Sequence, residues 1–368
     1  MKVLHITSRA DHGGGPRHIE LLLHHLPPAF ENHVACPLDE PYESRLASAS
    51  DRRVIHIPHR KLELTSILSV CRYVKRHGIE IIHTHGKGAG LYGRAASFFS
   101  RIPCVHTPHG VHIECYSKPV ARVYAAYENI TSAFVKCLIY VSNEERAVAA
   151  ENGLWRHKNS KTIPNGVPCV DSRDVLGHRS HIRGELGLSS EQFVVATLSR
   201  FDFQKNMQEA FQVARSSPNF VFLWIGDGKD VNELKTMCAQ ENVTNIRFMG
   251  AVENPIPLLS AADAYLTTSR WEGLPLAVLE AMACGLPVIA SEVAGHKEIV
   301  GTRSAGVLYR PGHPEEAAQA IMRLRENPNE ARALGHNARS AQVDLYSASR
   351  MALAVSHVYE AAVSRGHN

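Results

Sequence analysis

The chain has 368 residues, of which 44% are hydrophobic and 21% are charged, a composition typical of a soluble globular protein long enough for two domains. Its 40 basic and 36 acidic side chains leave a net charge of +4, which suits anionic ligands or an anionic membrane surface but is too small to indicate nucleic-acid binding. No apolar run is long enough to span a bilayer, and the eight cysteines include no C-x-x-C pair, so we expect a cytoplasmic protein with reduced thiols.

The first residues predict a nucleotide-binding unit, because a strand, a glycine-rich loop and a helix follow one another over residues 2–26. Gly13 and Gly15 resemble the first two glycines of a dinucleotide fingerprint. His18 stands where the third glycine is expected, which argues against NAD. The alternative interpretation of the glycines is that they only permit a tight turn.

Histidines mark the strand ends in the rest of the first half. Strands are expected over residues 33–37, 53–57, 79–83, 103–107 and 138–141, with a helix over residues 66–77. The histidines at or beyond two of these strand ends are His83, His85, His106, His109 and His112. Their spacing matches no standard metal site, and no cysteine or carboxylate completes a ligand set, so we predict no metal. His109 is expected instead to hydrogen-bond a sugar hydroxyl.

A helix with basic and apolar side chains is expected over residues 117–136, where Lys118, Arg122 and Lys136 lie among valines and aromatic residues. Two interpretations are open for it. It lies on an anionic membrane surface, or it packs on the core and keeps a solvated basic edge.

A second strand–loop–helix series begins after residues 169–188, which are polar, lack an apolar period and are expected to link two domains. Its strands are expected over residues 193–199, 220–225, 246–249, 264–267 and 288–291. Because the alternation of strands and helices restarts after the link, the sequence predicts an α/β protein with two doubly wound domains.

The most informative segment runs over residues 272–287. Pro275 suits the first position of a helix, and Gly285 followed by Pro287 suits its end. Glu272 therefore lies in the loop before this helix, and Glu280 lies about two turns into it. A helix N-terminus attracts phosphate, and carboxylates beside it can accept hydrogen bonds from sugar hydroxyls, so the pair indicates a nucleotide sugar. The alternative is a buried helix with an ordinary surface carboxylate at each end.

With Glu272-x7-Glu280 in place, four further motifs line up in order. They are Gly13-Gly14-Gly15 with His18, Pro108-His109-Gly110, Pro164-Asn165-Gly166-Val167, and Ser199-Arg200 with Lys205. Over essentially its whole length the chain resembles glycosyltransferase family 4, the retaining enzymes of the GT-B fold. The resemblance implies two Rossmann-like domains facing each other across a cleft. Residues 1–168 would bind the acceptor, residues 169–344 would bind the nucleotide-sugar donor, and residues 345–368 would form a helix that crosses back to the first domain.

The resemblance also implies roles for individual residues. His109, Glu272, Arg200 and Lys205 match the catalytic positions, at which the two cations grip the donor diphosphate. The donor-binding positions are Gly14, Gly15, His18, Asn165, Gly250, Gly273, Leu274, Leu276, Ala277 and Glu280, of which Glu280 would hold the ribose. One residue departs from the pattern, since Asn206 replaces the glycine that usually follows the lysine. Asparagine tolerates the left-handed backbone region, so we expect the loop to be kept.

The activity implied by the resemblance is retaining transfer of a hexose or N-acetylhexosamine from a nucleotide-diphosphate sugar to a hydroxyl of a glycan or lipid-linked glycan. Family frequency favours UDP over GDP or ADP, and surface polysaccharide or lipopolysaccharide biosynthesis as the setting. No Asp-x-Asp motif stands at a strand end, so we expect no metal and no other cofactor. We expect a cytoplasmic enzyme that can associate peripherally with the inner face of the membrane and has no nucleic-acid partner.

Three other functions fit parts of the sequence. A non-hydrolysing UDP-sugar epimerase shares the architecture and needs no acceptor. An NAD-dependent oxidoreductase fits the first glycine-rich loop, with Asp39 or Glu40 near the place of a ribose-binding acid. A non-catalytic sugar-binding or scaffold protein is the third class, and the coexistence of all the donor-side residues argues against it.

Overall fold

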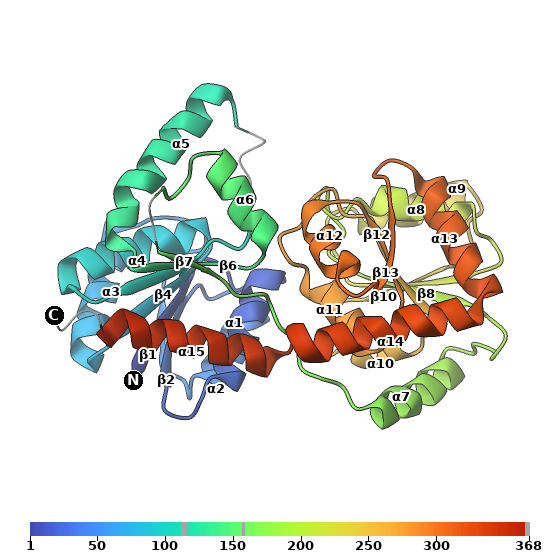
Figure 1. Cartoon of the computed structure of the whole chain (residues 1–368), viewed down its shortest axis with the longest axis horizontal. Helices are drawn as coiled ribbons and strands as arrows, with labels where there is room; N and C mark the ends of the chain where they lie inside the picture. The colour runs from blue at the N-terminus through green and yellow to red at the C-terminus, as the bar shows by residue number, and fades with distance from the viewer. Residues whose placement is uncertain (112–115, 157–158, 365–368) are drawn as a thin grey trace. The chain divides into compact units, whose positions relative to one another are not determined.

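The computed structural model describes residues 1–111, 116–156 and 159–364. The chain forms two compact units, which we call the N-terminal unit (Met1–Gly166 with Ala348–Asn368) and the C-terminal unit (Val167–Ser347). Each unit is built on one parallel sheet with helices on both faces (Figure 1). None of the helices in the described ranges is both long and apolar enough to cross a membrane.

The N-terminal unit contains a seven-stranded parallel sheet in the order β3-β2-β1-β4-β5-β6-β7. Its strands are β1 (Lys2–Thr7), β2 (Glu31–Cys36), β3 (Val54–His56), β4 (Ile81–His85), β5 (Cys104–Thr107), β6 (Cys137–Tyr140) and β7 (Ser160–Thr162). Its helices are α1 (Gly14–His25), α2 (Tyr42–Ala49), α3 (Leu64–His77), α4 (Lys87–Ser100), α5 (Lys118–Thr131), η1 (Ser132–Phe134), α6 (Asn143–Glu151) and α15 (Ala348–Ser364). The strand order reverses between β1 and β4, and open sheets bind ligands at the carboxyl ends of the strands at such a reversal.

The C-terminal unit contains a six-stranded parallel sheet in the order β10-β9-β8-β11-β12-β13. Its strands are β8 (Val194–Leu198), β9 (Val221–Ile225), β10 (Ile246–Gly250), β11 (Ala264–Thr267), β12 (Val288–Ser291) and β13 (Gly306–Tyr309). Its helices are α7 (Ser172–Glu185), α8 (Met207–Arg215), α9 (Val231–Gln240), α10 (Ile256–Ser260), α11 (Leu276–Ala283), α12 (Ala294–Gly301), α13 (Pro314–Glu326) and α14 (Pro328–Leu345). The strand order reverses between β8 and β11, which places the ligand-binding edge at the loops that follow them.

Both sheets are covered on both faces, as parallel sheets require, and their strands are therefore almost continuously apolar. In the C-terminal unit Phe211, Phe222 and Trp224 belong to one buried cluster of side chains from α8 and β9. In the N-terminal unit Leu4 and Ile82 belong to a cluster that includes residues of α3 and α4.

The last helix of the chain, α15, packs on the N-terminal unit although α14 before it belongs to the C-terminal unit. Tyr359 on α15 places its hydroxyl 2.6 Å from His83 Nδ1 on β4, and its ring lies 5.9 Å from the ring of Phe30. The predicted return of the C-terminal helix to the first half of the chain is confirmed, and residues 365–368 of that prediction lie outside the described residues.

Residues 169–188 were predicted to be a polar link between two domains, but α7 occupies most of this segment and belongs to the C-terminal unit. This helix is held by guanidinium groups rather than by an apolar stripe. Arg183 Nη1 donates to the Ala261 carbonyl at 2.9 Å, and Arg179 Nη2 donates to Asp263 Oδ1 at 2.6 Å. Sequence periodicity detects apolar stripes, so it missed a helix that is anchored by hydrogen bonds.

Three predicted boundaries also change. Helix α1 begins at Gly14, so Gly14 and Gly15 belong to its first turn rather than to a loop. The expected helix over residues 117–136 is shorter, because α5 ends at Thr131 and the 3-10 turn η1 follows. Helix α11 begins at Leu276, one residue later than predicted, and Pro275 is its N-cap with an extended backbone.

Candidate active site

Two loops at the carboxyl edge of the C-terminal sheet carry predicted donor residues, and a third loop packs against them. The loop between β8 and α8 contains Arg200 and Lys205, and the loop between β11 and α11 contains Glu272. The third loop follows β12 and leads into α12, where Gly295 lies in the first turn. A Cβ atom on Gly295 would lie 2.3 Å from the Gly273 carbonyl oxygen, so this close approach of the second and third loops requires a glycine.

Lys205 and Glu272 form a nearly buried ion pair. Lys205 Nζ lies 2.5 Å from Glu272 Oε1, and the two side chains are 17% and 7% exposed. Ser269 Oγ donates a hydrogen bond to the same carboxylate oxygen at 2.6 Å. Burial is the largest single influence on Glu272 and raises its pKa, but the charge of Lys205, the nearby His296 and the hydrogen bonds from Lys205 and Ser269 together hold the pKa below its ordinary value of 4.5. The site therefore keeps the Glu272 carboxylate ionised.

Arg200 is the second predicted cation of this edge, and it remains partly exposed. Its Nη2 lies 3.1 Å from Asp202 Oδ2 and donates to Gln204 Oε1 at 3.1 Å. Gln204 Nε2 donates to the Trp271 carbonyl at 3.1 Å, so the first loop is tied to the loop that carries Glu272. The guanidinium group is positioned by neighbours from its own loop and retains exposed N–H donors for an anion.

Asn206 occupies the left-handed region with φ 53° and ψ 47°. This confirms the expectation that asparagine replaces the usual glycine without loss of the turn. The side chain also connects the site, because its Oδ1 accepts from Arg270 Nη2 at 2.8 Å and its Nδ2 donates to Glu209 Oε2 at 2.6 Å. A glycine at this position would keep the turn but make neither bond.

Helix α11 begins directly after the loop that carries Glu272. The first N–H groups of a helix have no partner within the helix, and at α11 they belong to Leu276 and Ala277 among the predicted donor residues. Glu280 is buried on the second turn of the helix. Gly250, also predicted for the donor site, ends β10 with φ 72°, and its carbonyl accepts a hydrogen bond from the Gly226 N–H at 2.7 Å.

His296 on α12 was missed by the sequence analysis. Its Nδ1 donates to the Ser291 carbonyl at 2.8 Å, whereas its buried Nε2 has no hydrogen-bond partner within the described ranges. Burial lowers the pKa of His296, and its nearness to Glu272 opposes that shift. The signal that was available is its place shortly after β12, at the same edge as Glu272.

A chain of histidines in the N-terminal unit runs from His5 within β1, through His85 at the end of β4, to His109 in the loop after β5. Asn32 Oδ1 lies 3.3 Å from His5 Nε2, His5 Nδ1 lies 3.4 Å from His85 Nε2, and His85 Nδ1 lies 3.1 Å from His109 Nε2. An amide oxygen can only accept, so His5 Nε2 carries the proton and His5 Nδ1 accepts from His85 Nε2. His85 Nδ1 then accepts from His109 Nε2, and Asn32 fixes the tautomer of each ring.

Burial keeps these imidazoles neutral. It lowers the pKa of His5 to about 3 and that of His18 to about 4. It also lowers the pKa values of His85 and His109 well below 6.5. His109 has a left-handed backbone with φ 56° and is the partly exposed member of the chain. A neutral, partly exposed imidazole held in one tautomer is suited to hydrogen-bond a hydroxyl group.

Two other histidines from the predicted set have structural partners. His83 is enclosed by the Tyr359 hydroxyl at 2.6 Å and Thr107 Oγ1 at 2.8 Å. His106 Nδ1 lies 2.8 Å from Thr84 Oγ1. His112 lies outside the described residues.

His18, Asn165 and the first turn of α1 complete the predicted residues of the N-terminal unit. The ring of His18 lies 4.5 Å from the ring of His109, and the buried Asn165 side chain is close enough to favour the protonated form of His18 slightly. A Cβ atom on Gly14 or Gly15 would meet no atom within 4 Å, so open space lies beside the N-terminus of α1.

The geometry fits an enzyme that handles nucleotide sugars. One parallel α/β unit has a cation–carboxylate pair before a helix N-terminus, and the other has neutral histidines near its strand ends. The family profile "Glycosyl transferases group 1" matches residues 178–341, and the profile "Glycosyltransferase Family 4" matches residues 12–170. The chain belongs to this glycosyltransferase family, has its GT-B fold, and is an enzyme that transfers a sugar from a nucleotide sugar. The epimerase and oxidoreductase alternatives are thereby set aside.

Curated relatives and a solved structure agree with this assignment. UDP-Gal:alpha-D-GlcNAc-diphosphoundecaprenol alpha-1,3-galactosyltransferase of Escherichia coli is 29% identical over 275 residues, which cover 72% of this chain and 71% of the relative. The putative glycosyltransferase EpsD of Bacillus subtilis strain 168 is 26% identical over 311 residues, 80% of this chain and 81% of the relative. The crystal structure of HepE from Anabaena in complex with UDP-glucose aligns with a TM-score of 0.85 over 98% of this chain and 100% of HepE, at 22% identity.

Proposed function

We propose that this enzyme transfers a hexose or N-acetylhexosamine, with retention, from a UDP-sugar to a hydroxyl group of a lipid-linked glycan, and that it needs no metal ion. The observation that carries the proposal is the Lys205–Glu272 pair beside Arg200 and the N-terminus of α11. The setting we propose is surface polysaccharide or lipopolysaccharide biosynthesis at the inner face of the membrane. The names of the E. coli relative and of the HepE complex support UDP, and the former also supports a lipid-linked acceptor.

The charges explain the chemistry without a metal. As the glycosidic bond breaks, negative charge develops on the β-phosphate, and Arg200, Lys205 and the first N–H groups of α11 stabilise it. The acceptor hydroxyl attacks the anomeric carbon from the side of the leaving group. Its proton passes to a β-phosphate oxygen, so the products are the glycosylated acceptor and UDP.

The two glutamates and His109 bind hydroxyl groups in this scheme. Glu272 is kept ionised by Lys205 and can accept hydrogen bonds from the transferred sugar. Glu280 holds the ribose hydroxyls, and His109 donates to or accepts from a hydroxyl of the donor sugar. Gly14, Gly15 and Gly273 allow the backbone to approach the diphosphate and the sugar.

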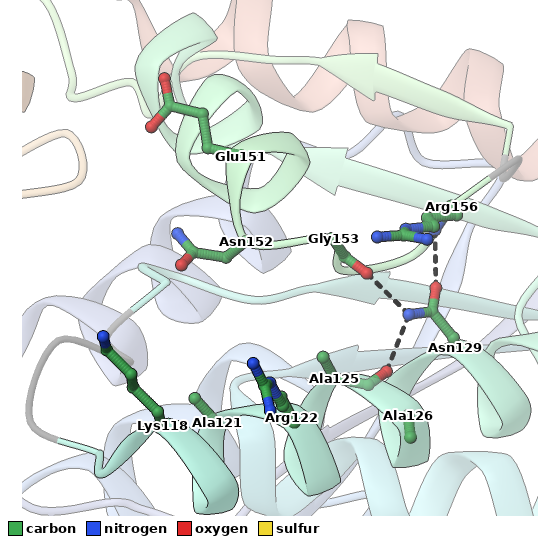
Figure 2. A pocket seen from close by; sticks show the side chains of 10 residues that line it. All are labelled: Lys118, Ala121, Arg122, Ala125, Ala126, Asn129, Glu151, Asn152, Gly153 and Arg156. Atoms are coloured by element: carbon green, nitrogen blue, oxygen red, sulfur yellow. Dashed lines mark hydrogen bonds between the residues drawn. The ribbon is translucent and has the colours of Figure 1, made fainter.

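Helix α5 supports contact of the N-terminal unit with an anionic membrane. Of its residues only Glu128 is buried, whereas Val123 is 71% and Ile130 is 73% exposed. A cavity of about 510 Å³ lies along the same helix, and its lining includes the basic Lys118, Arg122 and Arg156 and the acidic Glu151 (Figure 2). Apolar side chains next to cations suit the interface of an anionic bilayer and support this interpretation for the exposed face of the helix, while Tyr124 and Ala125 pack against a buried cluster.

Asn129 fixes the shape of this cavity (Figure 2). Its Nδ2 donates to the Ala125 and Gly153 carbonyls at 2.8 and 2.7 Å, and its Oδ1 accepts from the Arg156 N–H at 2.8 Å.

We expect wild-type protein to sediment with vesicles that contain anionic lipid and to be released by high salt. The double variant Val123→Ser/Ile130→Ser should bind less, and equal binding of the two proteins would remove the membrane role of α5.

The decisive test of the donor is a thermal-shift panel with UDP, GDP, ADP, their common sugars and NADH, in EDTA throughout. A ligand at a hundred times its dissociation constant adds about 2.7 kcal/mol of stability, which is readily measured. We expect UDP and its sugars to raise the melting temperature, and Lys205→Met to lose most of that shift. The control is Arg215→Met, which removes an exposed ion pair with Glu241 at the other end of α8. A shift by another nucleotide would replace UDP in the proposal, and no shift by any nucleotide would overturn it.

A further inference from the structure

His18 is a buried polar side chain without an evident structural role. It lies on α1 with its ring 4.5 Å from that of His109 and 5.6 Å from that of His85. Neither of its ring nitrogens has a hydrogen-bond partner of normal geometry among the described residues, and Asn165 is its polar neighbour. A buried imidazole in this state forgoes hydrogen bonds that water would supply, so its place next to two other imidazoles calls for an explanation.

The nitrogens of the three rings are close enough to share one ion. One nitrogen each from His18, His85 and His109 lies within 4.8 Å of the others, and the His85 Nδ1–His109 Nε2 distance is 3.1 Å. In a tetrahedral zinc site with Zn–N bonds of about 2.0–2.1 Å, the ligand nitrogens are about 3.4 Å apart. We propose that His18, His85 and His109 form a binding site for a divalent transition metal that prefers imidazole, such as Zn²⁺, Ni²⁺ or Cu²⁺.

The hydrogen bonds around His85 fit a metal ligand. Its Nε2 faces His5 Nδ1, and His5 Nε2 in turn donates to Asn32 Oδ1, so the Nδ1 lone pair of His85 points toward His109. Metal-bound histidines usually donate their second N–H to such a partner, which holds the ring in place. The ion would replace the proton that His109 Nε2 shares with His85, and that proton would move to His109 Nδ1.

A second trio, His5, His83 and His85, also has one nitrogen from each ring within 4.8 Å of the others, but it suits a metal less well. Both nitrogens of His83 are occupied, by the Tyr359 hydroxyl and by Thr107 Oγ1. An ion there would break these bonds, whereas an ion at His18 gives that ring its first strong partner. His109 is also partly exposed, so an ion can reach the first trio from solvent.

The proposed consequence is inhibition of sugar transfer, because an ion on His109 removes the imidazole from the donor sugar. This consequence rests on the proposed function, whereas metal binding itself does not. The metal is an inhibitor rather than a cofactor, which is compatible with metal-independent transfer.

The test measures binding without any nucleotide sugar. Protein stripped with EDTA and freed of chelator is titrated with Zn²⁺ against a chromophoric chelator, and with Co²⁺ while the visible absorption is recorded. We expect one Zn²⁺ per chain and the intense absorption of tetrahedral Co²⁺. His18→Ala and His85→Ala should each weaken Zn²⁺ binding by at least tenfold. The control His181→Ala, which removes an exposed histidine of α7, should leave binding unchanged, and melting in EDTA verifies that each variant is folded.

Three outcomes would overturn the site. They are wild-type affinity in the folded His18→Ala variant, no Zn²⁺ held at micromolar concentrations, and loss of binding in His83→Gln with retention in His18→Ala. Inhibition of transfer by Zn²⁺, reversed by EDTA, supports the consequence separately. If no UDP-sugar is a donor but one Zn²⁺ still binds through His18, the site stands and the proposed function fails.

Discussion

The two units place opposite kinds of chemistry at the same edge of similar sheets. The C-terminal unit gathers charged groups, and its nearly buried Lys205 and Glu272 neutralise each other. The N-terminal unit gathers imidazoles that burial keeps uncharged, linked from Asn32 to His109 by hydrogen bonds. A buried charge needs a partner, whereas a neutral ring needs only a donor or an acceptor. We therefore infer that the C-terminal unit acts on its ligand mainly through charged groups, whereas the N-terminal unit acts through hydrogen bonds from neutral rings.

Acid should destabilise the N-terminal unit before the C-terminal unit, and this is the largest effect we expect. His5, His18, His83, His85, His106 and His109 all have pKa values lowered by burial. The unfolded chain binds protons at these rings below about pH 6.5 while the folded chain does not, so stability is lost as pH falls from 6.5 toward the folded pKa values. Each such ring contributes about 1.4 kcal/mol per pH unit in that window.

The C-terminal unit should resist the same change for longer. The pKa of Glu272 is lowered, so its contribution is complete above the ordinary value of 4.5 and is lost only as pH falls below it. Among the described residues of this unit, the histidine with a lowered pKa is His296. Hydrogen exchange read peptide by peptide should show β1, β4 and β5 losing protection near pH 5 while β8 and β11 keep it. Loss of protection in both units at one pH would break the comparison.

The N-terminal unit also contains ion pairs, and the most deeply buried one among its described residues, Arg94–Glu128, lies away from the histidine chain. Arg94 Nη2 and Glu128 Oε2 lie 2.5 Å apart with side chains 5% and 3% exposed, and Trp155 Nε1 donates to the same oxygen at 2.8 Å. Removing one charge leaves the other buried without its partner, so we expect Glu128→Gln to cost about 3–5 kcal/mol of unfolding free energy. Urea denaturation followed by tryptophan fluorescence measures it.

The control for this variant is Glu241→Gln, which breaks the exposed pair with Arg215 and should change the free energy of unfolding by about 0–1 kcal/mol. Equal effects of the two substitutions would mean that burial does not decide the value of an ion pair here. Activity should follow stability in Glu128→Gln, because this pair contacts α4 and α5 rather than the proposed donor residues.

The Lys205–Glu272 pair should act on the reaction as well as on the fold, because removing either member leaves the other nearly buried without its partner. On the proposed function, Lys205→Met removes a cation from the developing phosphate charge and should lower kcat/KM by about 10²–10³-fold. Glu272→Ala should nearly abolish transfer as well. The thermal melt in EDTA is compared first, so that loss of the fold is separated from loss of chemistry. Wild-type-like turnover of either folded variant would refute the site assignment.

The fold was largely predictable because most of its elements carry an apolar signal. Strands β1, β11 and β12 begin and end where the alternating or continuous apolar runs predicted. Helix α7 was missed because Arg179 and Arg183 anchor it through hydrogen bonds to carbonyl groups and Asp263, an arrangement without a periodic apolar stripe. Periodicity reports burial of apolar surface and is blind to such anchors.

The site was predictable where one local motif carries it. Glu272 and the start of α11 are neighbours in sequence, and Lys205 meets Glu272 because β8 and β11 are adjacent strands. The histidine cluster was not predictable as a set, because His5, His18, His85 and His109 come from β1, α1, β4 and the loop after β5. Only the order of the strands in the sheet brings them together. The spacing rules for metal sites describe ligands that are close in sequence, so they do not detect this cluster.

Asn206 offers the smallest and most selective test of the charged site, because it separates the role of a backbone conformation from that of a side chain. Asn206→Gly keeps the left-handed turn and loses the bonds to Arg270 and Glu209, which should cost about 1–2 kcal/mol. Asn206→Ala loses the same bonds and adds about 1 kcal/mol of strain at φ 53°. Chemical denaturation of the two variants gives the difference directly. If glycine and alanine are equally stable, the turn itself contributes nothing measurable, and the amide bridge between Arg270 and Glu209 alone explains why an asparagine serves where the family usually has a glycine.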